Sequence, residues 1–75
     1  MPTRLRHKMP DTIRDAIQAR RLMDAYRSRP AYQQNDYIGW VTRAKRAATK
    51  QKRLNQMLHE LEGGKLYMNM KWSPK

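Results

Sequence analysis

Apolar residues recur along the chain at the spacing of one helix face, and the first such segment extends from about Thr12 to Arg27. Its apolar members are Ile13, Ala16, Ala19, Met23 and Tyr26, with Leu22 beside them. Asp11 or Thr12 can accept hydrogen bonds from the free amides of the first turn. Pro30 follows shortly after the last apolar residue and cannot continue a helix. The pattern therefore predicts one helix over this segment.

Two further apolar stripes predict a second and a third helix. The second helix starts between Pro30 and Gln33 and ends at Ala47 or Ala48. Its stripe consists of Tyr37, Trp40, Val41, Ala44 and Ala48. The third helix extends over about residues 50–62, and its stripe consists of Leu54, Met57, Leu58 and Leu61.

The phase of these two stripes predicts a break between the second and third helices. At about 100° per residue the stripes differ by roughly a quarter turn, so one straight helix could not press both onto the same core. We therefore expect a break near Ala48-Thr49, with the Thr49 side chain capping the third helix.

The C-terminal segment follows a different period. Gly63-Gly64 ends the third helix, because glycine readily adopts the left-handed conformation of a helix C-terminus. Beyond it, apolar and polar residues alternate as in an extended segment, with Leu66, Met68, Met70 and Trp72 as the apolar members. One isolated strand is unstable, so we expect a tail whose apolar side covers the helices. The alternative is a strand or anchor offered to a partner protein.

These elements predict an all-α fold with three parts. A basic flexible leader occupies residues 1–10, a small three-helix domain occupies residues 11–62, and the extended tail occupies residues 63–75. A chain of 75 residues is long enough for one domain only. The oligomeric state is left open by the sequence.

Composition narrows the class of protein further. Cysteine is absent, so the chain has neither disulfides nor thiolate ligands for a metal. No uncharged stretch approaches the ~20 residues of a membrane-spanning helix. From these features we expect a cytoplasmic protein with no membrane span.

Positive charge is concentrated in one part of the chain. The net charge is +11, from 17 Lys and Arg against 6 Asp and Glu. Residues 37–53 contain six cationic residues and no acidic one, namely Arg43, Lys45, Arg46, Lys50, Lys52 and Arg53. The predicted helix places Lys50 and Lys52 in its first turn, where the helix dipole disfavours positive charge. An external anion is one way to compensate such an arrangement.

We interpret this cluster as a ridge that binds nucleic-acid phosphates. The free amides after Thr49 would add an anion-binding site to the side-chain cations. Arg4, Arg6 and Lys8 would form a mobile arm along the polymer. The predicted function is therefore non-enzymatic binding to a polyanion, RNA or DNA.

A solvated surface is the alternative interpretation of the same charges. In it, Arg53 or Lys45 pairs with Asp24 or Asp36 on a neighbouring helix. The sequence leaves both interpretations open.

Aromatic residues offer the ridge a second kind of contact. Tyr37 and Trp40 could stack on exposed bases, although their helical spacing favours packing in the core. Tyr67, in the tail, is the freer candidate for stacking.

Catalytic and metal-binding patterns are missing from the sequence. His7 lies in the leader, and His59 has only Glu62 at helical spacing, which is too little for a metal site. Neither a Gly-rich phosphate loop nor a nucleophile elbow is present. We therefore predict no enzyme activity and no cofactor.

From Arg29 to Trp72 the chain resembles the bacterial YdeI/OmpD-associated family. The matching residues are Tyr37-Ile38, Trp40-Val41, Ala44-Lys45, Thr49, Arg53-Leu54, Gly63-Gly64 and Tyr67-Met68. Where the family often has a Pro-Glu pair just before the matching Thr, this chain has Ala47-Ala48.

The resemblance implies a small helical module and a loose link to tolerance of bacteriocins or cationic antimicrobials. It supplies the alternative function, a helical adaptor for an acidic protein with a role in envelope stress or antimicrobial tolerance. The interface expected for that function is the apolar side of the tail, formed by Leu66, Met68, Met70 and Trp72.

Overall fold

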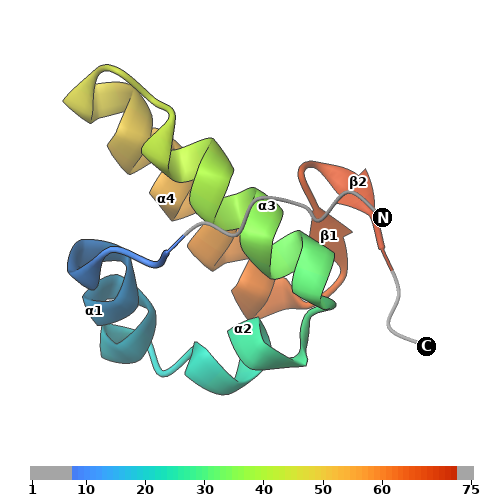
Figure 1. Cartoon of the computed structure of the whole chain (residues 1–75). Helices are drawn as coiled ribbons and strands as arrows, with labels where there is room; N and C mark the ends of the chain where they lie inside the picture. The colour runs from blue at the N-terminus through green and yellow to red at the C-terminus, as the bar shows by residue number, and fades with distance from the viewer. Residues whose placement is uncertain (1–7, 73–75) are drawn as a thin grey trace, which may run out of the picture.

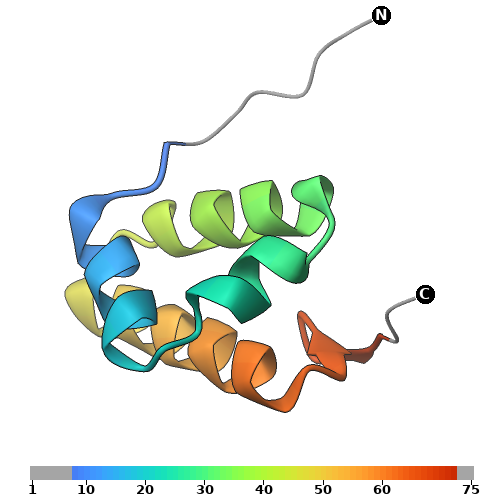
Figure 2. The same ribbon diagram turned by 90° about the horizontal axis from the view of Figure 1, so that it is seen from below.

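Four helices and a two-stranded hairpin follow one another along residues 8–72, the part of the chain that the computed structural model describes (Figure 1). The helices are α1 (Asp11–Ala19), α2 (Met23–Ser28), α3 (Ala31–Thr42) and α4 (Ala47–Gly63). The strands are β1 (Leu66–Tyr67) and β2 (Met70–Lys71). The two long helices, α3 and α4, run side by side in opposite directions, and α1 and α2 close one side of the pair (Figure 2). The prediction of an all-α, three-helix fold is confirmed only in part, because residues 8–72 are mostly helical but form four helices and a small hairpin.

The single helix predicted from Thr12 to Arg27 is wrong, because it divides into α1 and α2. Arg21 has a φ of 58°, and the amide of Leu22 donates to the carbonyl of Ile17 across the turn. In a continuous helix, Leu22 would point about 180° away from Ile13. The left-handed residue redirects the chain, so that Ile13 and Leu22 both enter the core.

A break between α3 and α4 is present, but it lies at residues 43–46 and not at Ala48-Thr49. The N-terminal cap of α4 is Arg46, which has an extended backbone and makes no side-chain hydrogen bond to the helix. Thr49 lies inside the first turn, so its predicted capping role is also wrong. Ala44 is buried, and the turn around it lets both helices face the same core.

The predicted extended tail is a hairpin, in which Leu66 pairs with Lys71 and Tyr67 with Met70. Met68 and Asn69 form the turn with φ values of 50° and 66°. Two left-handed residues are typical of the tight turns that match the twist of a hairpin. Gly64 is left-handed as predicted, and its amide closes the end of α4 on the carbonyl of Glu60.

The hydrophobic core lies where the four helices meet. Its buried members are Ile13, Ile17, Leu22, Tyr26, Tyr37, Ile38, Val41, Leu54, Met57, Leu58 and Leu61. Tyr67 and Met68 of the hairpin segment pack against this cluster from the end of α4. The core therefore joins the hairpin to one end of the α3–α4 pair. The cationic residues lie at the opposite end, where α3 turns into α4.

Candidate functional site

Five cationic side chains are exposed where α3 turns into α4, and we call this group the basic corner. Its members are Arg43, Lys45, Arg46, Lys50 and Lys52. Within residues 8–72, none of the five makes a side-chain hydrogen bond or an ion pair. Because α4 starts at Ala47, Lys50 lies in its first turn and Lys52 in its second. The free amides of this helix end are those of residues 47–49, since the amide of Lys50 already donates to the Arg46 carbonyl at 2.9 Å.

Arg53, the sixth cation of the predicted ridge, has an internal role. Its side chain is half-buried, and its Nη1 donates to the Trp40 carbonyl at 2.8 Å. Its guanidinium carbon lies 5.3 Å from the centroid of the Trp40 ring. Arg53 therefore ties α4 to α3 and is not part of the basic corner.

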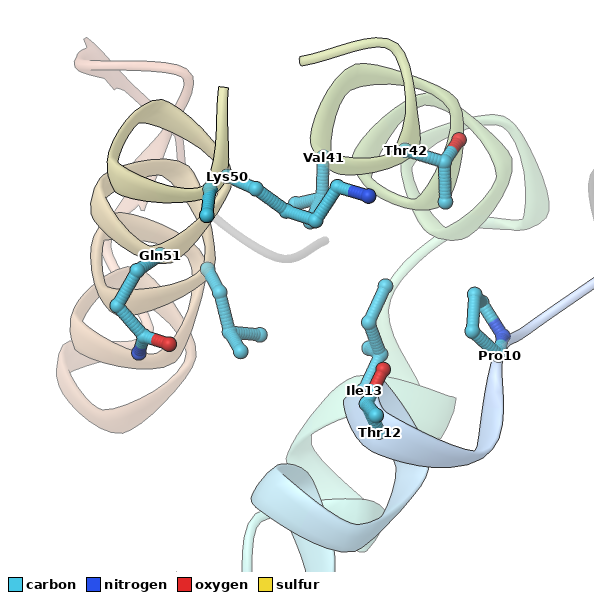
Figure 3. Close-up of a pocket in the computed structure, with 9 residues that line it drawn as sticks. Pro10, Thr12, Ile13, Val41, Thr42, Lys50 and Gln51 are labelled. Carbon is cyan, nitrogen blue, oxygen red and sulfur yellow. The ribbon is translucent and has the colours of Figure 1, made fainter. Parts of the chain in front are cut away.

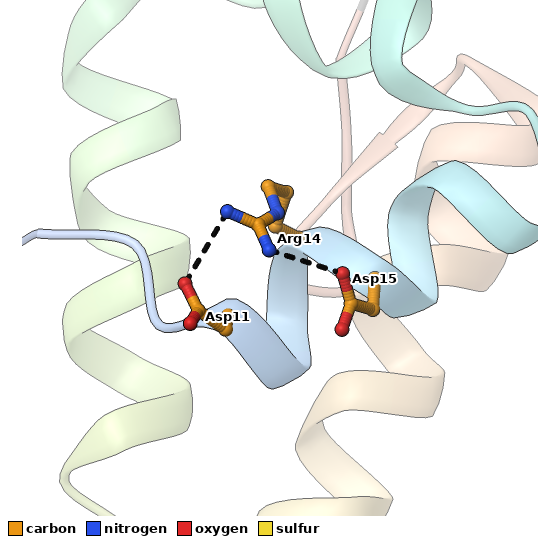
Figure 4. Close-up of polar contacts among 3 residues, drawn as sticks. All are labelled: Asp11, Arg14 and Asp15. Carbon is orange, nitrogen blue, oxygen red and sulfur yellow. Dashed lines mark hydrogen bonds and ion pairs between the residues drawn. The ribbon is translucent and has the colours of Figure 1, made fainter.

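Neither Lys45 nor Arg53 pairs with a carboxylate in the described part of the chain, so the pairing with Asp24 or Asp36 is not formed. The ion pairs seen among residues 8–72 join Arg14 to Asp11 and to Asp15, each at 3.3 Å, on the surface of α1 (Figure 4). The two carboxylates are largely exposed and the Arg14 side chain is about half exposed, so these pairs contribute little to stability.

The predicted arm lies mostly outside the described residues. Arg4 and Arg6 belong to residues 1–7, which are not described, and Lys8 is exposed.

The apolar face predicted for the tail is not a single open surface. Met70 is 59% exposed, whereas Leu66, Met68 and Trp72 are half-buried. The guanidinium carbon of Arg29 lies 4.3 Å from the centroid of the Trp72 ring, which holds that ring against the helices. The hairpin thus directs most of this apolar surface inward.

The aromatic residues considered for base stacking are engaged within the protein. Tyr37 is fully buried. Tyr67 packs edge-on against Tyr32 and Tyr37, and its hydroxyl donates to Asp36 Oδ2 at 2.7 Å.

A buried carboxylate at the end of α4 organises the hairpin. Glu60 is 1% exposed and accepts hydrogen bonds from the Tyr37 hydroxyl, the Gln56 amide, and the backbone amides of Met68 and Asn69. Burial by itself raises the pKa of the Glu60 carboxyl, but these hydrogen bonds outweigh it, and the pKa lies below its ordinary value. Burial, reinforced by the carboxylate of Glu60, raises the pKa of the Tyr37 hydroxyl. Sequence reasoning missed this cluster, because its members come from three separate elements.

Arg29 extends the same buried cluster toward α3. It is 4% exposed, donating through Nη2 to the Glu60 carbonyl at 2.9 Å and through Nη1 to Gln33 Oε1 at 3.2 Å. Every buried side-chain polar atom of residues 8–72 has a hydrogen-bond partner. This cluster is therefore a structural network whose buried polar atoms are all hydrogen-bonded within the protein.

A hollow of about 270 Å³ lies beside the basic corner, where the start of α1, the end of α3 and the start of α4 come together (Figure 3). Its apolar lining consists of Pro10, Ile13, Val41, Ala47 and Leu54. Lys50 reaches from α4 across one edge of the hollow toward the end of α3 (Figure 3). The sequence patterns did not reveal this hollow, because it depends on how the three helices are placed.

The described residues contain neither a metal-binding cluster nor a membrane-spanning helix. No group of three or more His, Cys, Asp or Glu side chains in residues 8–72 is placed to hold a metal ion, and His59 is exposed on α4. Within the same residues, no helix has the length and apolar character required to span a bilayer.

Comparison with known proteins shows a match to a protein family. A family model described as "Bacteriocin-protection, YdeI or OmpD-Associated" matches residues 7–64, which is more than half of the chain. No curated protein and no solved structure matches the chain. The matched residues include α1 to α4 and the whole of the basic corner.

Proposed function

This chain belongs to the bacteriocin-protection, YdeI/OmpD-associated family, and from that premise and its surface charge we propose that it is a non-enzymatic adaptor. In this proposal the basic corner docks on an acidic surface of a partner protein. The observation that carries it is the exposure of five clustered cations with no internal partner among the described residues.

The charge of the basic corner has an energetic cost for the free protein. Lys50 lies in the first turn of α4, where the helix dipole disfavours a positive charge by about 0.3–1 kcal/mol. Arg43, Lys45 and Arg46 add further repulsion from the preceding turn. An acidic partner would remove this repulsion, and long-range attraction would accelerate the encounter.

A protein partner is favoured over a nucleic acid by the hollow beside the cations. Its apolar lining is aliphatic, as Ile13, Val41 and Leu54 illustrate. Binders of single-stranded nucleic acid instead present aromatic rings to successive bases. Because Tyr37 and Tyr67 are engaged within the protein, the chemistry around the corner favours protein side chains over the bases of a single-stranded nucleic acid.

The family description refers to bacteriocin protection. We place the adaptor in that physiology, as a module that brings an acidic protein into a response to bacteriocins or similar antimicrobials.

The test is recovery of a partner by tagged variants in the presence of nuclease. One variant carries Arg43→Gln, Arg46→Gln and Lys50→Gln in the basic corner. The matched control carries Arg20→Gln, Arg27→Gln and Lys71→Gln, which remove the same charge from exposed positions elsewhere. We expect the wild type and the control to retain a stoichiometric protein partner after nuclease treatment, and the corner variant to lose it. Equal recovery by both variants would refute the assignment of the corner.

Nucleic-acid phosphates are the second candidate, favoured by the net charge of +11. That function predicts binding to random DNA or RNA that weakens steeply between low and physiological salt. It also predicts a smaller salt dependence for the corner variant than for its control. Recovery of the partner that disappears on nuclease treatment would favour this candidate over the adaptor.

A further inference from the structure

The hollow beside the basic corner is large enough to receive an apolar side chain. At about 270 Å³ it is smaller than the ~300–1,000 Å³ typical of pockets for small molecules and cofactors. Ile13, Val41 and Leu54 form an aliphatic lining, and each is largely buried. An apolar group that entered would gain contacts with all three helices that surround the hollow.

The edge of the hollow adds charge to this apolar lining. Lys50 crosses it, and its ammonium group lies on the side of α3 near Thr42 (Figure 3). Arg46 and Ala47 precede Lys50 at the start of α4, so the basic corner continues directly into the hollow. The complement of this site is an apolar group with carboxylates next to it.

We propose that the hollow receives an apolar side chain, such as leucine, from an acidic segment of a partner protein. The carboxylates of that segment lie against Lys50 and the rest of the basic corner. This inference rests on the proposed adaptor function and specifies what the corner recognises. A second copy of this chain is a poor occupant, because it would bring two basic corners, each on a chain of net charge +11, toward one another.

Two blocked hexapeptides provide the probe. One has the sequence Asp-Glu-Leu-Leu-Glu-Asp, and its control has serine in place of both leucines, so that the charge is the same. Each is titrated into the full chain labelled with nitrogen-15, and binding is followed through the backbone amide resonances. We expect the leucine peptide to bind about tenfold more tightly, as burial of one aliphatic side chain predicts. Its largest shifts should fall on Ile13, Val41 and Leu54.

Matched variants separate the hollow from the charge around it. Ala47→Trp places a large ring at the hollow, whereas Ala48→Trp adds the same ring at the adjacent exposed position, which does not line it. Ala47→Trp should remove the tenfold preference for the leucine peptide, and Ala48→Trp should retain it. Lys50→Gln should weaken the leucine peptide severalfold more than Lys52→Gln, because only Lys50 borders the hollow. Helical circular dichroism of each variant confirms that the fold is intact.

The outcomes distinguish this inference from the proposed function. Equal binding of the two peptides would overturn the inference about the hollow while supporting an acidic partner for the corner. Failure of both peptides to bind would overturn the adaptor function together with the inference. Binding of an oligothymidine by the corner, with neither peptide bound, would reassign the corner to nucleic acid and overturn both.

Discussion

Removal of the Glu60 carboxylate tests whether this side chain holds the hairpin on the helices. Glu60→Ala takes away the acceptor of four hydrogen bonds, from the Tyr37 hydroxyl, the Gln56 amide and the two amides of the hairpin turn. The backbone carbonyl of Glu60, which accepts from Arg29, remains in the variant. The substitution therefore measures the contribution of the carboxylate separately from that of the rest of the buried network.

The expected loss follows from the burial of the orphaned donors. A buried donor without a partner costs about 1–3 kcal/mol. The Tyr37 hydroxyl is fully buried, so its loss of a partner has the full cost. Met68 is half-buried and Asn69 is exposed, so their backbone amides can in part form hydrogen bonds with water instead. We expect a loss of about 3–5 kcal/mol in the free energy of unfolding. A chain of this length has a total stability of about 4–11 kcal/mol, so much of it would be lost.

Urea denaturation followed by far-ultraviolet circular dichroism at neutral pH measures this loss. Tyr37→Phe should cost less, about 1–2 kcal/mol, because the carboxylate keeps three of its four donors. Glu62→Ala, at an exposed position of the same helix, is the matched control and should cost under about 0.5 kcal/mol. Equal losses for Glu60→Ala and Glu62→Ala would refute the role of the carboxylate, as would a Tyr37→Phe loss larger than that of Glu60→Ala.

Glu60, Arg21 and Arg53 each have a contact or backbone conformation whose contribution to stability can be measured. The pKa of the Glu60 carboxyl is lower in the folded protein than in the unfolded chain. Its contribution to stability is therefore present above the unfolded pKa of this carboxyl and is lost as pH falls through the folded pKa. Denaturation of Glu60→Gln should be less acid-sensitive than that of the wild type. Arg21→Gly should raise the free energy of unfolding by about 0.5–1 kcal/mol, since Arg21 is exposed with a φ of 58°, and an unchanged or lower denaturation midpoint would contradict it. Arg53→Lys should lower stability by about 1 kcal/mol through loss of the hydrogen bond to Trp40, whereas Lys52→Gln should leave the denaturation midpoint unchanged.

The sequence predicted the helix boundaries that are set by residues at or next to the boundary itself. The end of α4 was predictable because Gly64 is the residue type that a left-handed helix terminus favours. The phase of the apolar stripes was sufficient to predict that a break follows α3. The position of this break could not be predicted, because residues 43–46 contain neither glycine nor proline. The burial of Ala44 in the core determines where the chain turns.

The phase of the apolar residues in the first segment also indicates a break between α1 and α2. The fully buried Ile17 lies outside the predicted stripe, which contains Ala16 and Ala19 in its place. Ile17 and Leu22 lie about 140° apart on a straight helix, so they could not both face one core without the turn at Arg21. A left-handed arginine has no local sequence signal, and tertiary packing determines it.

The hairpin could not be predicted locally, because its turn depends on a residue from another element. Met68 and Asn69 do not form one of the dipeptides that favour such a turn, and methionine is disfavoured at positive φ. Both turn amides donate to the Glu60 carboxylate, at 2.8 and 2.9 Å, which offsets the cost of that backbone. The stabilising group thus lies eight and nine residues before the residues that it holds.

The two ends of α4 provide the strongest argument for a partner at the basic corner. The helix is charged against its dipole at both ends, with Lys50 in the first turn and Glu60 in the last. At the C-terminal end the folded chain supplies the compensation, since the turn amides and the Tyr37 hydroxyl surround the Glu60 carboxylate. At the N-terminal end the described residues supply none, and Lys50 lies exposed at the edge of an apolar hollow. The acidic partner that we propose would supply at the N-terminal end of α4 the compensation that the folded chain supplies at its C-terminal end.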